Sequence, residues 1–351
     1  MPDRRHLLRL GATAALAAPA LLRVSAANAQ EVTLRLHHFL PAVSNVHRYF
    51  LQPWAQKIQQ ESGGRLRIQI FPSMQLGGAP AQLYDQARDG VADIIWTLPG
   101  TTPGRFPRIE VFELPFVSHK RAIVNCRAVQ EFADKHLREE FGEVHPLCVW
   151  GHGEGLIHSR REVKTMEDLR GLKLRFPSRL NGEALRALGA APVGMPVPQV
   201  PEALSQGVID GAVVPWEVVP ALRLQEMVRH HTEVPGSPTL YIATFIIGMN
   251  KAKYQSLPED LRKVLDANSG QAAATMAAVP WDERGPVAEE MARKRGNQVT
   301  VISEEEKRRW VEATQPVIEA WVAQSRERGF DGAALLAEAR ALVAKHGQGV
   351  A

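Results

Sequence analysis

The chain has 351 residues, a formal net charge of +4 and a hydrophobic content of 45%. This length is typical of about two globular domains. Residues 1–30 hold four arginines and one aspartate, so the remainder of the chain carries a charge of only +1. A nearly neutral chain without an arginine and aromatic stripe lacks the cations that bind a phosphate backbone, so we expect no nucleic-acid partner.

The chain begins with the three parts of a secretory signal peptide. Arg4 and Arg5 precede the apolar run LGATAALAAPALL, and an A-x-A cleavage site follows at residues 27–29. The paired arginines also resemble a twin-arginine signal, so both Sec and twin-arginine export stay open. No later stretch reaches the roughly 20 apolar residues of a membrane span. The sequence therefore predicts a leader over residues 1–29 and a soluble mature protein in an exported compartment.

Strand-like and helix-like segments alternate after the leader. The alternating runs at 32–36 and 66–71 predict strands, and 91–97 predicts a mostly buried strand. Helices are expected between them, at 47–62 and 79–89. A strand, helix, strand, helix, strand order predicts parallel pairing with helices on the sheet faces, which is an α/β arrangement.

The middle of the chain repeats this order. Thr165 is expected to cap a short helix that Gly171 ends, directly before the strand-like run GLKLRFP. A helix at 182–188, a loop at 191–198, a helix at 201–206 and strands at 208–214 and 241–250 follow. Capping boxes at Ser256 with Glu259 and at Ser303 with Glu306 predict that the last fifth of the chain is mostly helical.

The common catalytic and nucleotide-binding patterns are absent from the sequence, including G-x-S-x-G, H-E-x-x-H and the P-loop. His152 with Glu154 is a weak acid–base candidate, and a structural histidine is the favoured interpretation. The pairs His37-His38 and His230-His231 point to opposite sides of an extended chain, so we expect no metal site. The sequence leaves open whether Cys126 and Cys148 are free or bridged.

Six segments resemble the solute-binding subunits of tripartite ATP-independent periplasmic (TRAP) transporters in both sequence and order. They are SMQLG at 73–77, PGRFP at 103–107, FELPF at 112–116, EDLRGLKLRFP at 167–177, LGAAP at 188–192 and ALSQGVIDG at 203–211. The resemblance implies an α/β, two-domain periplasmic binding protein with a hinge and a ligand cleft between the domains. It places residues 31–151 plus 241–280 in domain one, and 152–240 plus 281–345, with the C-terminal helices, in domain two.

The resemblance also implies a function. An organic acid would be captured by cleft closure and delivered to the membrane permease subunits, without enzymatic activity and without a cofactor. A dicarboxylate or keto-acid binder of the same family, and an exported enzyme acting on a carboxylate, are the alternatives. The oligomeric state is not indicated by the sequence.

Arg175 is the predicted ligand anchor. Leu172, Leu174 and Phe176 share one face of the GLKLRFP strand, and Lys173 and Arg175 share the other. In the family, the arginine of this motif binds the carboxylate of the ligand, so the resemblance assigns that role to Arg175. A planar guanidinium matches a carboxylate with two parallel hydrogen bonds, whereas Lys173 lacks this geometry and is expected to be solvated.

Departures from the family pattern indicate the ligand class. Gly155 stands where sialic-acid binders have a second cleft arginine, Val214 stands where they have asparagine, and Val197 replaces a phenylalanine. Burying a second carboxylate or several hydroxyls without partners is costly. We therefore predict a monocarboxylate with an apolar or aromatic body.

The other predicted cleft residues are apolar walls and hydroxyl donors, with core packing as the alternative for the aromatic ones. They are Phe39, Trp96, Trp216, Thr97, Ser178, Val214 and His38. Some keto-acid binders of the family hold a metal through a Glu-Trp pair, but here the order is Trp216-Glu217 and the pair comes later. No metal is therefore expected, although Glu217 leaves the question of a cation open.

Overall fold

A computed structural model describes residues 31–350 of the chain. It separates residues 1–30 from a compact unit that begins at Glu31, and only this unit is considered below. The expected leader at 1–29 lies outside the described residues. Within residues 31–350, no helix combines the length and apolar character needed to cross a membrane.

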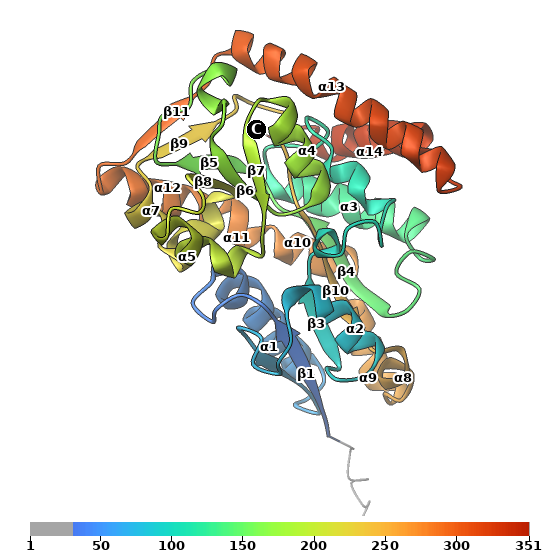
Figure 1. The fold of residues 1–351 in the computed structure, drawn as a ribbon. Helices are drawn as coiled ribbons and strands as arrows, with labels where there is room; N and C mark the ends of the chain where they lie inside the picture. Colours follow the sequence, from blue (N-terminus) through green and yellow to red (C-terminus); the bar gives the residue numbers. More distant parts are fainter. Residues whose placement is uncertain (1–30, 351) are drawn as a thin grey trace, which may run out of the picture. The chain divides into compact units, whose positions relative to one another are not determined.

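The first sheet has five strands in the order β2-β1-β3-β10-β4 (Figure 1). β1 pairs in parallel with β2 and β3, as expected, whereas β10 runs antiparallel to β3 and β4. Helices α1, α3 and α10 pack on this sheet. The strands are β1 (Val32–His38), β2 (Leu66–Phe71), β3 (Ile94–Thr97), β4 (His145–Gly151) and β10 (Thr244–Met249).

The second sheet has six strands in the order β11-β9-β5-β8-β6-β7. β6 pairs in parallel with β7 and β8, and β5 runs antiparallel to β8 and β9. The strands are β5 (Leu156–Ser159), β6 (Lys173–Phe176), β7 (Ala191–Gly194), β8 (Gly211–Val214), β9 (His230–Glu233) and β11 (Gln298–Val301). The expectation of a loop at 191–198 is wrong for β7, because an edge strand tolerates Pro192, which has no N–H to donate.

Helices of varied length connect the strands, and the longest helix, α13, lies near the C-terminal end of the described residues. The α-helices are α1 (Gln52–Glu61), α2 (Leu83–Arg88), α3 (Ala122–His136), α4 (Arg179–Ala187), α5 (Val200–Ser205), α6 (Val219–Leu222), α7 (Leu224–Met227), α8 (Lys251–Gln255), α9 (Glu259–Ala267), α10 (Gln271–Ala277), α11 (Val279–Asp282), α12 (Gly285–Lys294), α13 (Glu304–Glu327) and α14 (Gly332–Gly347). One π-helix precedes α1, namely η1 (His47–Leu51). The short 3₁₀ helices are η2 (Pro80–Gln82), η3 (Pro99–Thr101), η4 (Ile109–Glu113), η5 (Met166–Leu169), η6 (Val197–Gln199) and η7 (Trp216–Val218).

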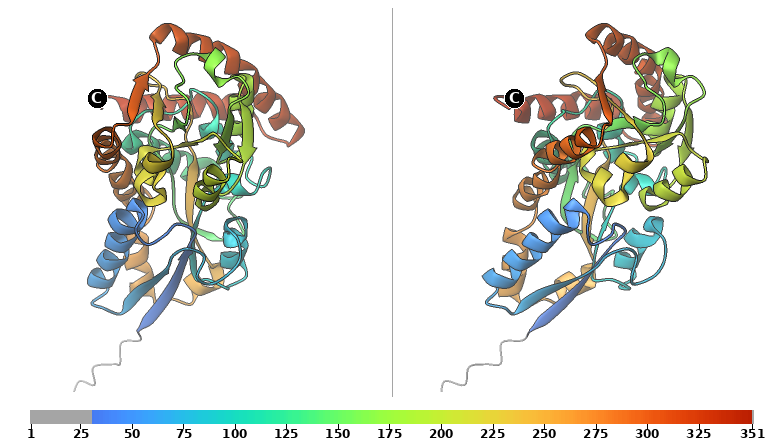
Figure 2. Two further views of the ribbon diagram at one scale, coloured as in Figure 1. Left: turned by 60° about the vertical axis from the view of Figure 1, so that its left-hand side comes forward. Right: turned by 90° about the vertical axis from the view of Figure 1, so that its left-hand side faces the viewer.

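The last two helices pack on different parts of the fold (Figure 2). α13 packs against α4, which covers the second sheet, while α14 packs against α3 beside the first sheet. The Ser303 hydroxyl accepts a hydrogen bond from the Glu306 N–H at 3.0 Å, so the expected cap of α13 is present. The expected box at Ser256 is wrong, because Pro258 precedes α9 and the Ser256 hydroxyl donates to the carbonyl of Lys253.

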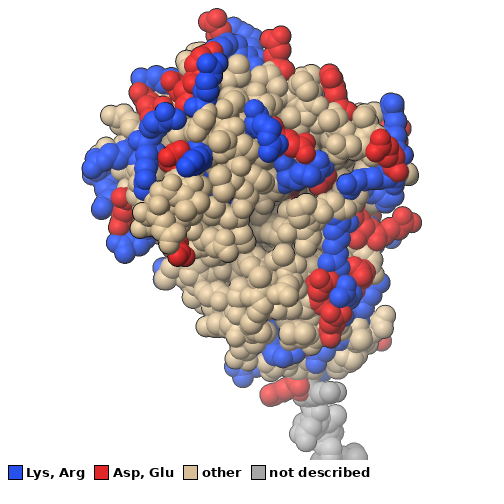
Figure 3. All heavy atoms as spheres, viewed as in Figure 1, with Lys and Arg blue, Asp and Glu red and all other residues tan. Residues whose placement is uncertain are grey.

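Charged side chains are unevenly distributed over the surface. On the face seen in Figure 3, Lys, Arg, Asp and Glu gather toward the edges, including the region of α13. The middle of this face is mostly uncharged and is hollowed near its centre.

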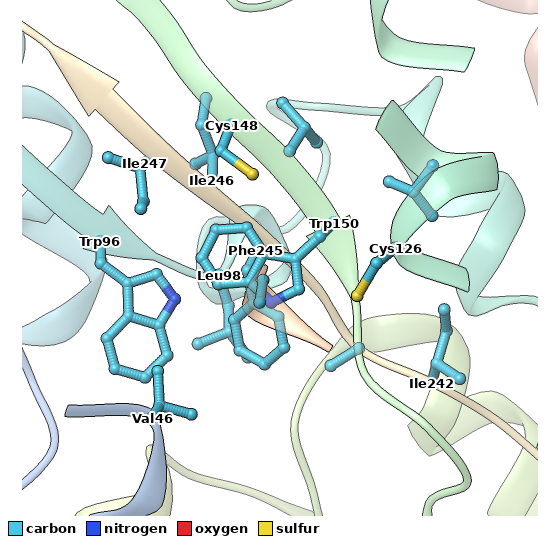
Figure 4. Close-up of a cluster of buried hydrophobic side chains, with 14 of the residues drawn as sticks. Val46, Trp96, Leu98, Cys126, Cys148, Trp150, Ile242, Phe245, Ile246 and Ile247 are labelled. Atoms are coloured by element: carbon cyan, nitrogen blue, oxygen red, sulfur yellow. The ribbon is translucent and has the colours of Figure 1, made fainter. Parts of the chain in front are cut away.

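Aromatic side chains from strands of the first sheet form a buried cluster (Figure 4). The rings of Trp96 and Trp150 stack with centroids 6.3 Å apart, and Phe245 lies 5.3 Å from Trp150. Cys126 and Cys148 border this cluster, and both are free and buried. Burial raises the pKa of both thiols well above the ordinary value, so they behave as small apolar side chains.

Two segments cross between the sheets side by side. Residues 152–155 lead from β4 to β5, and residues 234–243 lead from β9 to β10. The Gly155 N–H donates to the carbonyl of Tyr241 at 3.1 Å, and the Ala243 N–H donates to the His152 ring at 2.9 Å. The pocket described next is built on this paired crossing.

Candidate ligand-binding site

A small pocket of about 50 Å³ lies between the two sheets, at the crossing segments. Loops from the first sheet, the end of β8 and the start of α11 all contribute to its wall. Most of the lining is apolar, and its largest members are Phe39, Trp96, Leu98, Val214, Phe245 and Trp281. The polar side chains in the wall are those of His152, Arg175, Glu217 and Tyr241.

Arg175 enters the pocket from β6 and is only 4% exposed. Its Nε donates to the carbonyl of Met195 at 2.9 Å, and its Nη1 donates to the carbonyl of Val213 at 3.3 Å. These two bonds fix the guanidinium plane, while Nη2 has no protein acceptor among residues 31–350. Burial lowers the pKa of Arg175 to about 10, so the group still carries its charge at neutral pH.

No carboxylate of the described chain forms an ion pair with Arg175. A buried cation without a counter-ion is unfavourable by several kcal/mol in most settings, because it has lost its water without gaining an opposite charge. An anion that enters the pocket removes this penalty. Lys173, on the same strand, is exposed, as expected.

Tyr241 is a pocket residue that the sequence reasoning did not identify. A Cβ atom added at Gly155 would lie 2.2 Å from the Tyr241 ring, so the ring occupies the space that any side chain at 155 would need. The Tyr241 hydroxyl is buried and has no hydrogen-bond partner among the described residues. Burial raises the pKa of Tyr241 well above its usual range, so the hydroxyl stays protonated and can donate a hydrogen bond.

His152 has no hydrogen-bonding capacity left for a ligand. Its Nδ1 pairs with the carbonyl of Gly153 at 2.6 Å, and its Nε2 accepts from the Ala243 N–H. Burial lowers the pKa of His152 to about 4, so the ring is neutral at pH 7. Glu154 instead pairs with Lys120 at 3.0 Å. The two residues are therefore held as a structural histidine and a separate ion pair.

Glu217 lies in the wall at the start of η7 and is 3% exposed. Its Oε1 accepts from the Val46 N–H at 3.2 Å, and its backbone carbonyl accepts from Asn45 Nδ2 at 2.7 Å. Burial raises the pKa of Glu217 to about 8, which makes the carboxyl group mostly neutral at pH 7. Within residues 31–350, no group of three His, Cys, Asp or Glu side chains is placed to hold a metal.

The structure brings four of the eight predicted site residues into the pocket wall: Phe39, Trp96, Arg175 and Val214. Ser178 lines an adjoining hollow that also contains Arg175, and its hydroxyl is buried without a partner. Gly100 lies directly against Ser178 in this hollow, because a Cβ at residue 100 would lie only 2.5 Å from the Cβ of Ser178.

The other three predicted residues, Thr97, His38 and Trp216, do not line the pocket. Thr97 follows Trp96 on β3 and points to the opposite side, where its hydroxyl donates to the carbonyl of Pro80 at 3.3 Å. His38 Nε2 pairs with His47 at 2.9 Å behind the Trp96 ring. Trp216 turns away in η7 and donates from Nε1 to Glu233 at 2.7 Å.

Comparison with known proteins shows that this chain is similar to bacterial solute-binding proteins. Residues 36–325 match the family described as bacterial extracellular solute-binding protein, family 7. A TRAP solute-binding protein from Rhodoferax ferrireducens, solved with copurified benzoate, is 46% identical with a TM-score of 0.88, covering 91% of this chain and 100% of that one. A marine metagenome TRAP protein specific for aromatic acid ligands, solved with 3-hydroxybenzoate, is 42% identical with a TM-score of 0.88 and coverages of 90% and 99%.

Curated relatives are more distant in sequence but similar in length. An outer membrane transporter protein of Comamonas testosteroni is 26% identical over 311 residues, which is 88% of this chain and 90% of the relative. The C4-dicarboxylate-binding periplasmic protein of Rhodobacter capsulatus is 24% identical over 262 residues, or 74% and 77% of the two chains. The relatives thus include proteins named for different ligands.

Proposed function

Since the chain belongs to the bacterial extracellular solute-binding proteins of family 7, we propose that its pocket captures an aromatic monocarboxylate. The protein is the periplasmic solute-binding subunit of a TRAP transporter, and it delivers an organic acid to membrane permease subunits. The observation that carries the ligand class is Arg175, a buried cation without a counter-ion in a pocket whose other walls are mainly aromatic and aliphatic.

The proposed binding mode uses two donors for one carboxylate. Within residues 31–350, the Tyr241 hydroxyl has no hydrogen-bond partner, and the hydrogen bonds of Arg175 are made by Nε and Nη1, which leaves Nη2 for a ligand; both side chains line the same pocket. Two donors match the two oxygens of a carboxylate, and charge-assisted hydrogen bonds are strong when water is excluded. The ring of the ligand then packs among Phe39, Trp96 and Phe245. The neighbours that bind benzoate and 3-hydroxybenzoate support this ligand class.

A dicarboxylate fits this pocket less well than a monocarboxylate does. Arg175 is the only lysine or arginine in the described pocket wall, and the position of the second family arginine is Gly155, covered by the Tyr241 ring. A second carboxylate would therefore be buried among apolar side chains without compensation, which costs more than it gains.

Capture is proposed to proceed by closure of two domains, residues 31–151 plus 241–280 and residues 152–240 plus 281–345. The paired crossing segments would act as the hinge. Contacts of Gly100 with Ser178, and of Asn45 and Val46 with Glu217, would form as the cleft closes. Of the C-terminal helices, α14 packs on α3 in the first of these parts, and α13 packs on α4 in the second.

Binding without turnover is part of the same proposal. His152 is neutral with both ring nitrogens engaged, and Glu154 is paired with Lys120, so neither is free to transfer a proton to a ligand. The family is a transport component rather than an enzyme family. Incubation of the protein with benzoate should return the acid unchanged.

The test is a thermal-shift screen of protein freed of copurified ligand by unfolding and refolding. A ligand at about 100 times its Kd stabilises the folded state by about 2.7 kcal/mol, which gives a clear rise in Tm. Benzoate, 3-hydroxybenzoate and mandelate should raise the Tm, and succinate, pyruvate and sialic acid should not. A shift confined to the latter acids would overturn the proposed ligand class.

A further inference from the structure

The pocket has two chemically different ends. On one side it continues into the hollow that shares Phe39, Leu98, Arg175, Pro177 and Val197 with it. On another side it meets a hollow that shares Pro215, Glu217 and Trp281. These two hollows have no lining residue in common, so Arg175 and Glu217 mark different ends of the pocket. An acid that is anchored at Arg175 and fills the pocket would therefore reach the end lined by Glu217.

Glu217 has one unused hydrogen-bonding position. Its Oε1 accepts from the Val46 N–H, whereas Oε2 has no partner among the described residues. Burial favours the protonated carboxyl group, and because Oε1 already accepts a hydrogen bond, the proton belongs on Oε2. A protonated Oε2 can donate one hydrogen bond and accept another, which is the pattern that matches a hydroxyl group.

We propose that the Glu217 carboxyl group binds a hydroxyl substituent of the captured aromatic acid, at the end of the molecule remote from its carboxylate. The inference rests on the proposed function, since it assumes a carboxylate at Arg175. It specifies the ligand further, as a hydroxylated aromatic acid in preference to the unsubstituted or alkylated acid. A charged substituent is disfavoured at this end, because a neutral carboxyl group does not compensate a buried charge.

The alternative role of Glu217 is structural. Its bonds with Asn45 and Val46 join the loop after β1 to η7, and this contact alone would explain a buried glutamate. That role needs only Oε1 and the backbone carbonyl. A test must therefore depend on Oε2. The ratio of affinities for hydroxylated and methylated acids depends on Oε2, whereas the folding stability of the protein does not distinguish the two roles.

The experiment is isothermal titration of 3- and 4-hydroxybenzoate against 3- and 4-methylbenzoate, which have nearly the same shape without the hydroxyl. The wild-type protein should bind the hydroxy acid of at least one pair about tenfold more tightly than its methyl partner, as a single new hydrogen bond would produce. In Glu217→Leu this ratio should fall to about 1 or reverse, and Glu217→Gln should keep part of it. Glu226→Leu, which changes an exposed glutamate, is the control and should keep the full ratio.

The outcomes separate the two proposals. Equal ratios in the wild type and Glu217→Leu, or the absence of a hydroxyl preference in both wild-type pairs, overturn the role of Glu217 while leaving the proposed function standing. Failure of the wild type to bind any benzoate overturns the proposed function itself. Because the wild-type ratios need no variant, the inference stays falsifiable if Glu217→Leu does not fold.

Discussion

The two ends of the pocket show how one physical effect produces opposite electrostatic results. Arg175 and Glu217 are both almost fully buried, and neither has an ion-pair partner in the described part of the chain. Burial disfavours the charged form of each. It lowers the pKa of Arg175 only to about 10, which leaves the cation intact at pH 7, but it raises the pKa of Glu217 to about 8, which removes the negative charge.

Whether a buried group is charged at pH 7 depends on how far its ordinary pKa lies from 7, because burial shifts the pKa by a limited amount. An arginine has enough margin to remain a cation in an apolar pocket, and a glutamate does not. The pocket therefore has a positive end that selects an anion and a neutral polar end that can discriminate substituents.

The largest effect is expected from removal of the cation. Arg175→Ala should weaken aromatic-acid binding by about 100-fold or more, because the carboxylate would be buried without a counter-charge. Arg175→Lys should recover only part of the loss, since an ammonium group lacks the planar pair of donors. Isothermal titration measures both.

Lys173→Ala is the matched control, because Lys173 lies on the same strand and is exposed. Its affinity should equal that of the wild type within about twofold, since an exposed charge is largely screened by solvent. An Arg175→Ala protein that binds benzoate as tightly as the control would show that the anion binds elsewhere.

A smaller effect is expected for the pH dependence of folding stability in Glu217→Gln. The folded-state pKa of Glu217 is raised from 4.5 to about 8, so the folded protein holds this proton more tightly than the unfolded chain does. The stability from this group is complete below the unfolded pKa and is lost as the pH rises toward 8, at up to about 1.4 kcal/mol per pH unit. Glutamine does not titrate, so the variant lacks this loss.

The measurement is the difference in unfolding free energy between Glu217→Gln and wild type by urea denaturation at several pH values. The difference should move in favour of the variant by about 2 kcal/mol between about pH 6 and pH 8. The charged groups that surround Glu217 in the adjoining hollow are common to both proteins, namely Lys120, Arg121, Glu154, Glu233, Asp282 and Glu289. A difference that does not vary with pH would mean that Glu217 is ionised in the folded protein.

The smallest effect is expected for Tyr241→Phe. The hydroxyl has no partner among the described residues, so its removal should leave the Tm unchanged or raise it slightly, while affinity for benzoate falls about fivefold to tenfold. Tyr254→Phe is the control, because its hydroxyl bonds Asp266 away from the pocket, and it should not change affinity. Unchanged affinity in Tyr241→Phe would limit its role to filling the space beside Gly155.

The family and the α/β fold could be predicted from the sequence, and both are confirmed. Local patterns sufficed because strand alternation, caps and the ordered motifs all lie within short segments. The roles of Arg175 and the other site residues stay predictions, but Arg175 could be located because its motif also ends a recognisable strand. β7 was not predicted because it contains Pro192. Proline is tolerated in an edge strand, and the position of a strand at the edge of a sheet is not visible in the local sequence.

The rest of the site depends on contacts between residues far apart in the chain. Gly155 indicated a lost arginine, but only the folded structure shows that the Tyr241 ring occupies that place. Trp216 and Trp96 looked equivalent as aromatic walls, yet the turn η7 directs Trp216 to Glu233. Likewise, the register of β3 decides that Trp96 and not Thr97 faces the pocket.

The bonds from Asn45 and Val46 to Glu217 have a consequence for the timing of transport. They connect a loop of the first sheet to a short helix after β8 of the second, so the proposed opening of the cleft would have to break them. Two such bonds contribute about 1 kcal/mol each, which would lengthen the residence time of the ligand roughly 30-fold. Bonds of this strength would slow the loss of the ligand in the periplasm and still allow its release to the permease.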